Sequence, residues 1–284
     1  AGRHQDGGAS LDRDGQRMNL DITDQEFRRV QGFIFATAGI ALSPAKKALV
    51  CGRLAKRLRA RAIDSYADYM ALIESGNEPQ EQQMAVDLLT TNETYFFREP
   101  RHFELLRQWV TATNNRNQPW RVWSAASSSG EEAYSIAMVL ADCLDQRAFE
   151  VVGTDISTRV LTRARTGHYP MERARNVPPA YLRQFCLRGQ GAQEGTLLVD
   201  KQLRRHVRFE HANLNSELPK LGQFDVIFLR NVMIYFNGDT KRKVVARVTS
   251  MLKPGGYLCI GHSESLNEVT DAMTPLVPSV YRKP

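Results

Sequence analysis

The 284-residue sequence predicts an α/β protein with a doubly wound, mostly parallel sheet, a small all-α N-terminal domain and an inserted antiparallel β-subdomain. Three observations lead to this prediction. Helical patterns follow one another without strands over 20–89, strand and helix patterns alternate from residue 101 onward, and residues 168–206 interrupt that alternation. Alternating strands and helices are typical of a parallel sheet covered on both faces.

The composition indicates a folded protein without a membrane-spanning segment. Hydrophobic residues make up 42% and charged residues 24% of the chain, which is ordinary for a globular protein. No apolar run approaches the roughly 20 residues that a transmembrane helix needs. Residues 1–19 are polar and lack the apolar segment of a signal peptide, so we expect a disordered arm there.

The net charge and the cysteines indicate which class of partner the protein binds and in which compartment it folds. The net charge of +7 favours an acidic partner, although the sum alone does not separate nucleic acid from acidic protein. The four cysteines form no CxxC pair and the six histidines show no metal-ligand spacing, so we expect no metal site. Scattered cysteines fit the reducing cytoplasm.

The helical patterns over 20–89 should form a small bundle. Thr23 and Glu26 make a capping box before apolar residues at helical spacing, and Gly39 indicates the end of that helix. The later helices are expected to start at Pro44, Ser65 and Pro79. The helical pattern breaks over 90–100, which we interpret as the linker between domains.

The predicted second helix, residues 44–62, has one apolar and one basic face. The apolar face is expected to consist of Ala48, Cys51, Leu54, Ala55, Leu58 and Ala62. The basic residues are Lys46, Arg53, Lys56, Arg57, Arg59 and Arg61. A charged face is usually only solvated, but this helix holds no acid to offset repulsion between its like charges. An acidic partner explains such a stripe better.

The α/β domain is predicted over 101–284. Its expected strands are 121–125, 150–154, 207–211, 224–229 and 256–260. Its expected helices are 101–113, 131–145, 157–166 and 239–252. Pro254, Gly255 and Gly256 should end the last helix, whose buried face should include Leu252.

The segment 168–206 is too long for a simple connection between a helix and a strand. It contains two short apolar stretches, Gln184–Arg188 and Thr196–Asp200, on either side of a glycine-rich loop. We predict two short strands around this loop, which would form the inserted antiparallel subdomain.

The most informative motif is a strand followed by a turn of small residues, 125–130, and then a helix that begins with Glu131 and Glu132. Small residues let a ligand approach the backbone, and free N–H groups at the helix start point at it. Two carboxylates would repel a diphosphate. They suit a ligand with a cationic ammonium group, such as S-adenosylmethionine.

Polar residues at the ends of two other strands extend this candidate site. Asp155 is placed to accept the hydroxyls of a ribose, with an N-terminal cap for the helix at Ser157 as the alternative. Arg230 and Asn231 follow the apolar strand 224–229, where polar side chains lie in the ligand crevice. The alternative is that Arg230 pairs with a surface acid.

Asn213 and Leu214 follow the predicted strand 207–211. A neutral amide and a neighbouring aliphatic side chain could recognise and sandwich an adenine. A turn asparagine and a core leucine explain the two residues equally well.

Four motifs together resemble the chemotaxis receptor protein-glutamate O-methyltransferases, the CheR-type family, over about residues 20–284. The motifs are residues 90–99 (TTNETYFFRE), 123–132 (WSAASSSGEE), 228–236 (FLRNVMIYF) and 261–264 (GHSE). The resemblance implies a class I methyltransferase-like fold that transfers a methyl group from S-adenosylmethionine to receptor glutamate carboxylates, leaving S-adenosylhomocysteine. The family often has Pro where this chain has Ala133, which affects only local rigidity.

The resemblance also implies roles for individual residues. Arg98 and Tyr235 would lie nearest the transferred methyl group. Glu132 would face the amino-acid end of the cofactor and Asp155 its ribose. The cofactor site as a whole would comprise Asn92, Thr94, Arg98, Glu132, Asp155, Asn213, Leu214, Arg230 and Asn231.

The partners implied by the resemblance are the cytoplasmic methylation helices of chemoreceptors and, for some members, a peptide at the receptor's C-terminus. The helix residues facing the receptor would be Lys46, Arg53, Lys56, Arg57 and Arg59. The tail-binding loop would contain Arg188, Gly189, Gly191 and Gly195. We expect a cytoplasmic monomer that neither inserts into membranes nor binds nucleic acid.

Two other functions stay open at this point. The chain could be a methyltransferase-like receptor-binding module without turnover, which the complete set of candidate site residues argues against. It could also be a nucleic-acid methyltransferase, as its basic charge suggests. Enzymes that methylate amino groups of bases commonly carry prolines after the fourth strand, where this chain has Arg230–Met233.

Overall fold

The computed structural model describes residues 21–113, 118–144 and 148–284. The predicted disordered arm, residues 1–19, lies outside this part of the chain. Within it, no helix is both long and apolar enough to cross a bilayer. The chain divides into two compact units. The first comprises Ala41–Leu89 and the described residues up to Ala36, and the second comprises Thr37–Ile40 and Thr90–Pro284.

The first unit is helical, as predicted. Its helices are α1 (Asp24–Ala38, whose last two residues count with the second unit), α2 (Lys47–Arg61), α3 (Tyr66–Glu74) and α4 (Pro79–Leu89). The predicted capping box is present: the Glu26 carboxylate accepts from Thr23 N–H at 2.8 Å, and Glu26 N–H donates to Thr23 Oγ1 at 3.2 Å. Ser65 caps α3 by accepting from Asp68 N–H at 3.1 Å.

The buried face of α2 differs in part from the prediction. Val50, Leu54, Ala55 and Leu58 are buried, whereas Ala48 and Ala62 are exposed. Ala62 follows the end of the helix in the left-handed conformation, with φ of 52°, and so leaves the helical face.

Part of the basic stripe of α2 is neutralised by acidic side chains, which corrects the sequence-based interpretation. Arg57 forms an ion pair of 2.6 Å with Glu81, whose side chain is only 4% exposed, and Arg61 pairs with Glu78 at 2.9 Å. Arg53 donates to the Leu88 carbonyl at 3.0 Å. Both acids come from α4 and its N-terminal flank, which the pattern of a single helix cannot show.

The rest of the stripe stays available to a partner. Lys46, Lys56 and Arg59 are exposed, and none forms an ion pair with another described residue. The part of the stripe without an ion-pair partner among the described residues is therefore smaller than the sequence indicates.

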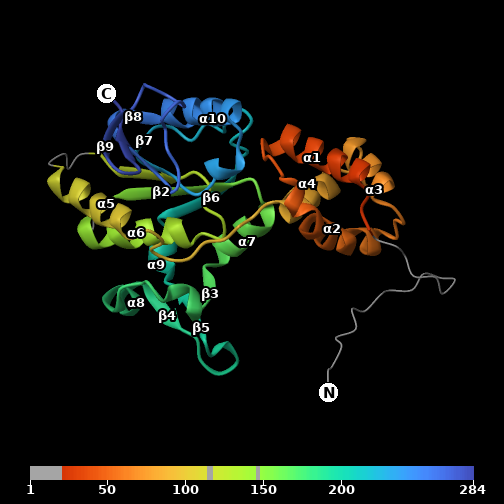
Figure 1. The fold of residues 1–284 in the computed structure, drawn as a ribbon. Helices are drawn as coiled ribbons and strands as arrows, with labels where there is room; N and C mark the ends of the chain where they lie inside the picture. The colour runs from red at the N-terminus through yellow and green to blue at the C-terminus, as the bar shows by residue number, and fades with distance from the viewer. Residues whose placement is uncertain (1–20, 114–117, 145–147) are drawn as a thin grey trace, which may run out of the picture. The chain divides into compact units, whose positions relative to one another are not determined.

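The second unit contains a seven-stranded sheet, mostly parallel, in the order β6-β2-β1-β7-β8-β10-β9 (Figure 1). Its strands are β1 (Trp120–Ser124), β2 (Phe149–Asp155), β6 (Val207–His211), β7 (Phe224–Leu229), β8 (Leu252–Ile260), β9 (Thr274–Val277) and β10 (Val280–Arg282). The first five of these run parallel, and β10 and β9 continue the sheet antiparallel. This architecture confirms the predicted fold class.

Helices cover both faces of this sheet. Neighbouring strand residues point to opposite sides, and the apolar side chains on each side have to be buried under helices. Val122 packs in the core beneath α5 (Arg101–Ala112) and α6 (Glu131–Leu144), and Trp123 packs in the core beneath α10 (Gly238–Ser250). Figure 1 shows α5 and α6 on one side of the sheet and α10 on the other. A further helix, α7 (Thr158–Thr166), follows β2.

The end of α10 corrects the prediction. The helix stops at Ser250, and Leu252 already belongs to β8. Pro254, Gly255 and Gly256 lie inside β8 at an irregularity of its pairing with β7. A Cβ on Gly256 would come within 2.9 Å of the Asp225 carbonyl, so this bulge needs a glycine there.

The inserted subdomain is an antiparallel sheet of three strands in the order β3-β5-β4. Its strands are β3 (His168–Pro170), β4 (Cys186–Arg188) and β5 (Thr196–Val199). The predicted pairing of the two strands around the glycine-rich loop is present. The third strand and the helices α8 (Pro179–Phe185) and α9 (Lys201–Arg204) were not predicted from the sequence.

Candidate active site

The candidate site lies at the carboxyl ends of the parallel strands. The chain turns away from β1 to β2 and β6 on one side, and to β7 and β8 on the other. Such a switch between neighbouring strands opens a crevice at their carboxyl ends. The small-residue turn and Arg230 follow strands at this edge, and Asp155 is the last residue of β2.

The turn after β1 has the tight geometry expected of it. Gly130 has φ of 96°, and a Cβ there would lie 2.8 Å from the Ala164 side chain. Ser128 also adopts a left-handed conformation, with φ of 49°. Because only a few per cent of non-glycine residues do so, this conformation is typical of turns and functional sites.

Asp155 is bonded to this turn. Its Oδ2 accepts from Ser128 N–H at 2.9 Å, and its Oδ1 accepts from Ser157 N–H at 2.9 Å. Ser128 Oγ in turn donates to the Asn92 carbonyl at 3.1 Å. The structure thus brings Asn92 and Asp155 together. Asp155 is not itself the N-terminal cap of α7, which is Ser157, but its carboxylate fixes the N–H of that residue.

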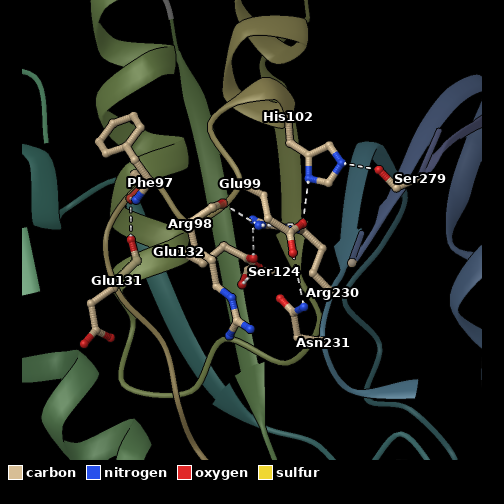
Figure 2. A network of polar contacts seen from close by, with 12 residues as sticks. Phe97, Arg98, Glu99, His102, Ser124, Glu131, Glu132, Arg230, Asn231 and Ser279 are labelled. Carbon is tan, nitrogen blue, oxygen red and sulfur yellow. Dashed lines mark hydrogen bonds and ion pairs between the residues drawn. The ribbon is translucent and has the colours of Figure 1, made fainter. Parts of the chain in front are cut away.

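Arg230 is the centre of a buried polar network, which Figure 2 shows. Its side chain is 1% exposed and contacts two carboxylates, Glu132 at 2.9 Å and Glu99 at 3.1 Å. It also donates to the Arg98 carbonyl. Glu132 accepts a further hydrogen bond from Ser124 Oγ at 2.7 Å. Arg230 therefore pairs with two largely buried acids, each 13% exposed, and not with a surface acid.

Burial raises the pKa values of Glu99 and Glu132, whereas the positive charge of Arg230 lowers them. Burial raises the pKa of Glu132 above its usual value despite the attraction of Arg230. Burial would also raise the pKa of Glu99, but Arg230 and the Asn231 side chain hold it below the usual value. The neighbouring His102 is neutral, because burial lowers its pKa to about 3 with a contribution from Arg230.

Asn231 and the segment after it are fixed by Glu264. The Glu264 carboxylate accepts from the N–H groups of Asn231 at 3.0 Å, Met233 at 2.8 Å and Gly261 at 2.6 Å. Asn231 is left-handed, with φ of 56°. This arrangement positions the short 3-10 helix Met233–Tyr235, which carries the half-buried candidate residue Tyr235.

Arg98 and Thr94 join the site through the 90–100 segment. The Thr94 carbonyl accepts from Arg173 at 2.6 Å. The guanidinium of Arg98 donates to the Glu93 carbonyl at 3.0 Å and lies 5.8 Å from the centre of the Tyr95 ring. Arg98 is half-buried and forms no ion pair with the described residues.

The Asn213 side chain makes hydrogen bonds to backbone groups, as expected if it is a turn asparagine. Its Oδ1 accepts from Asn215 N–H at 2.9 Å, and its Nδ2 donates to the Thr37 carbonyl at 2.6 Å. Leu214 is buried in the core beneath α10. Their contact with an adenine stays a prediction.

Sequence reasoning assigned no role to three side chains of this site, Glu99, His102 and Glu264. Their partners Arg230, Ser279 and Asn231 are far away in the sequence, so no local pattern reveals the contacts. A second signal is visible only in the structure. Of the non-glycine residues with positive φ in the described chain, four surround the site, namely Phe97, Glu99, Ser128 and Asn231.

Comparison with known proteins places the chain in a family. Residues 92–281 match the family described as CheR methyltransferase, SAM binding domain, and residues 25–90 match CheR methyltransferase, all-alpha domain. The chain is 41% identical to the chemotaxis protein methyltransferase of Klebsiella aerogenes, over 93% of this chain and 90% of that protein. It is 40% identical to the chemotaxis protein methyltransferase of Escherichia coli, over 92% of each chain.

Chemotaxis protein methyltransferase 2 of Pseudomonas aeruginosa is 39% identical, over 91% of this chain and 93% of that protein. These matches cover nearly all of the sequence and agree with the resemblance in the four motifs. The chain belongs to the CheR family of S-adenosylmethionine-dependent chemotaxis methyltransferases.

Proposed function

We propose that this chain transfers the methyl group of S-adenosylmethionine to glutamate side-chain carboxylates of chemotaxis receptors, which gives glutamyl methyl esters for sensory adaptation. Its family membership supports the reaction. One observation carries the assignment of the site. Arg230 donates to the carbonyl of Arg98, and Ser128, which is bonded to Asp155, donates to the carbonyl of Asn92, so both groups contact the same 90–100 segment.

The residues at this edge fit the cofactor. S-adenosylmethionine supplies a methyl group on a positively charged sulfur. We assign Asp155 to the ribose hydroxyls and Glu132 to the cationic amino-acid end, because an added cation stabilises a carboxylate that burial destabilises. The buried hydroxyls of Ser127 and Ser157 flank Asp155 in this region and have no hydrogen-bond partner among the described residues, as expected of groups that meet a ligand.

The chain's own residues have to position the substrate and exclude water. A glutamate has a pKa near 4.3, so the accepting carboxylate is already an anion at neutral pH and needs no general base. We assign Arg98 to holding this carboxylate and Tyr235 to orienting it. Positioning of this kind supplies roughly 7–11 kcal/mol in favourable cases. Too strong a pairing with Arg98 would stabilise the ground state and slow the reaction.

Substitution of Arg98 should separate turnover from cofactor binding. We expect Arg98→Ala to lower kcat by about a hundredfold or more, because a positioned charge is lost, and to change the Kd of S-adenosylhomocysteine by less than about threefold. Methylation of a receptor fragment with labelled cofactor gives the first quantity and calorimetry the second. An unchanged kcat would refute the role of Arg98.

The free part of the basic stripe supports contact with acidic methylation helices. Lys56 and Arg59 are exposed on α2 and have no ion-pair partner among the described residues. Reversing both charges (Lys56→Glu with Arg59→Glu) should lower kcat/KM for a receptor fragment by about tenfold at low salt, and less at high salt. As a control, the same reversal at exposed Lys201 and Lys243 should have little effect.

Arg57 belongs to the same stripe but pairs with Glu81, so its substitution should affect folding and not receptor binding alone. Arg57→Glu would place two carboxylates together in a buried site and should unfold the first unit rather than affect receptor binding selectively. If Lys56 and Arg59 variants match wild type in kcat/KM at every salt concentration, the receptor does not use this face.

The inserted subdomain supports binding of a receptor tail peptide. β4 is an edge strand, and beside it lies a hollow of about 400 Å³ lined by Leu187, Arg188 and Gly189 among others. Leu187 is 54% exposed there. An edge strand with a neighbouring apolar side chain can take an added strand.

Calorimetry with C-terminal receptor peptides tests this part of the proposal. Gly191 has φ of 57°, so Gly191→Ala strains the loop without filling any space and should weaken peptide binding. Gly76→Ala, at φ of 75° in the first unit, is the matched control and should leave peptide binding unchanged. Equal heats for all three proteins would place the tail elsewhere.

Since methylation helices are cytoplasmic, we place the chain in the cytoplasm. We propose that it acts as a monomer.

A further inference from the structure

Beside Arg230, three side chains bring ligand atoms together from distant parts of the second unit. Glu99 Oε2, His102 Nδ1 and His262 Nε2 all lie within 4.8 Å of one another. Glu99 and His102 flank the start of α5, and His262 follows β8. The proposed methyl transfer gives no role to either histidine.

The hydrogen bonds around Ser279 are best satisfied when Nε2 of His102 carries the ring hydrogen. Ser279 Oγ donates its only hydrogen to the Pro278 carbonyl at 2.6 Å, so it accepts from His102 Nε2 at 2.8 Å. This network assigns the ring hydrogen to Nε2. The other ring nitrogen, Nδ1, therefore presents a bare lone pair.

That lone pair faces the Glu99 carboxylate. Nδ1 of His102 and Oε2 of Glu99 are 3.6 Å apart. Both atoms are buried, and neither makes a hydrogen bond within the described chain. Two electron-rich atoms in this position repel each other. Arg230 pairs with the Glu99 oxygen at 3.1 Å, but the lone pair of His102 Nδ1 is buried without a partner, which is unfavourable. A cation between them removes both penalties.

The surrounding charge permits a further cation. Arg230 is the positive partner of both Glu99, at 3.1 Å, and Glu132, at 2.9 Å. With both acids ionised, these three groups carry a net charge of −1. The attraction of Arg230 therefore does not satisfy the whole negative charge of the cluster.

We propose that Glu99, His102 and His262 bind one divalent transition-metal ion of the Zn²⁺ type. Ligand atoms about 2.0–2.2 Å from a tetrahedral ion are about 3.3–3.5 Å apart. Glu99 Oε2 lies 3.6 Å from His102 Nδ1 and 3.8 Å from His262 Nε2, and the two histidine nitrogens lie within 4.8 Å of each other, so side-chain shifts have to close the remaining gap. Two imidazoles with one carboxylate select Zn²⁺ over Mg²⁺ or Ca²⁺.

The neighbours of these ligands fit the same site. Ser279 orients His102 through Nε2, and the other oxygen of Glu99 accepts from Asn231 Nδ2 at 3.3 Å. Such outer contacts are typical of metal-binding histidines and carboxylates. His262 is 56% exposed and leaves room for a water as fourth ligand. The ion would clamp the start of α5 to the segment after β8.

Titration of the full, tag-free chain with Co²⁺ tests the proposal. Chelator-treated protein should take up one equivalent of Co²⁺ with the visible absorption bands of a tetrahedral site, and Zn²⁺ should displace it. The affinity should fall about a hundredfold or more in His262→Ala, an exposed position whose loss does not disturb the core. His168→Ala, which removes an exposed histidine of the inserted subdomain, should bind as wild type does.

The measurement needs neither cofactor nor receptor, so its outcome is separate from that of the proposed methyl transfer. Zn²⁺ should also raise the Tm of wild type and His168→Ala but not that of His262→Ala. If wild type takes up no Co²⁺, or binds it no more tightly than His262→Ala does, the site does not exist. In that case the single ring hydrogen of neutral His102 lies on Nδ1 and points to Glu99, and Nε2 accepts from Ser279.

Discussion

Arg230→Met should destabilise the second unit by about 3–5 kcal/mol, because it leaves Glu99 and Glu132 buried without their positive partner. The loss should depend on pH. In the wild type Arg230 lowers the pKa of both carboxyl groups, so its contribution is present where they are ionised and is lost as the pH falls through their folded pKa values. Urea unfolding at several pH values measures this difference.

A second variant separates the charge effect from simple loss of packing. Adding Glu132→Gln to Arg230→Met removes one of the two unpaired acids and should recover about 1–3 kcal/mol of the lost stability. Glu132→Gln alone should have a smaller effect, since its amide oxygen can still accept from Arg230 and its NH₂ group can donate to the hydroxyl of Ser124. A loss under about 1 kcal/mol in Arg230→Met, independent of pH, would mean that the network contributes little.

Asp155→Ala should weaken binding of S-adenosylhomocysteine by about a hundredfold to ten-thousandfold. The proposal gives Asp155 two hydrogen bonds to the ribose, each worth about 1.5–3 kcal/mol when the acceptor is charged. The same substitution frees the N–H groups of Ser128 and Ser157, so thermal unfolding of the apo protein has to be measured beside calorimetry.

Two comparisons make the Asp155 result specific. Asp155→Asn keeps one acceptor and should retain most of the fold while still losing much of the affinity. Adenosine, which has the ribose but lacks the amino-acid end, should lose affinity in parallel. If Asp155→Ala binds S-adenosylhomocysteine as wild type does, the carboxylate serves only the start of α7.

The parallel core of the fold was predictable, because strands buried on both faces read as continuous apolar runs. The strands 207–211 and 224–229 have the predicted bounds. The edge strand β9 was missed because every residue in it is exposed, which leaves no alternation to detect. The third strand of the inserted subdomain, β3, has only three residues and ends in a proline.

The sequence suggests residues for the candidate site, but it does not reveal the contacts between them. Arg230 stood out because a charged residue interrupts an apolar run. Its pairing with Glu99 and Glu132 joins segments about a hundred residues apart, so it emerges only when the strands are assembled. The same holds for the first unit, where Glu81 compensates Arg57 from another helix.

The most direct test of the proposed function is the chemistry of the transferred methyl group. The chain is incubated with methyl-labelled S-adenosylmethionine and the cytoplasmic fragment of a chemoreceptor, and the labelled fragment is treated with mild base. Transfer to glutamate predicts an ester, so base should release the label as methanol, and replacing the labelled glutamates should abolish incorporation. Label that resists base, or no label on a fragment while the cofactor binds, would contradict carboxylate methylation by this chain.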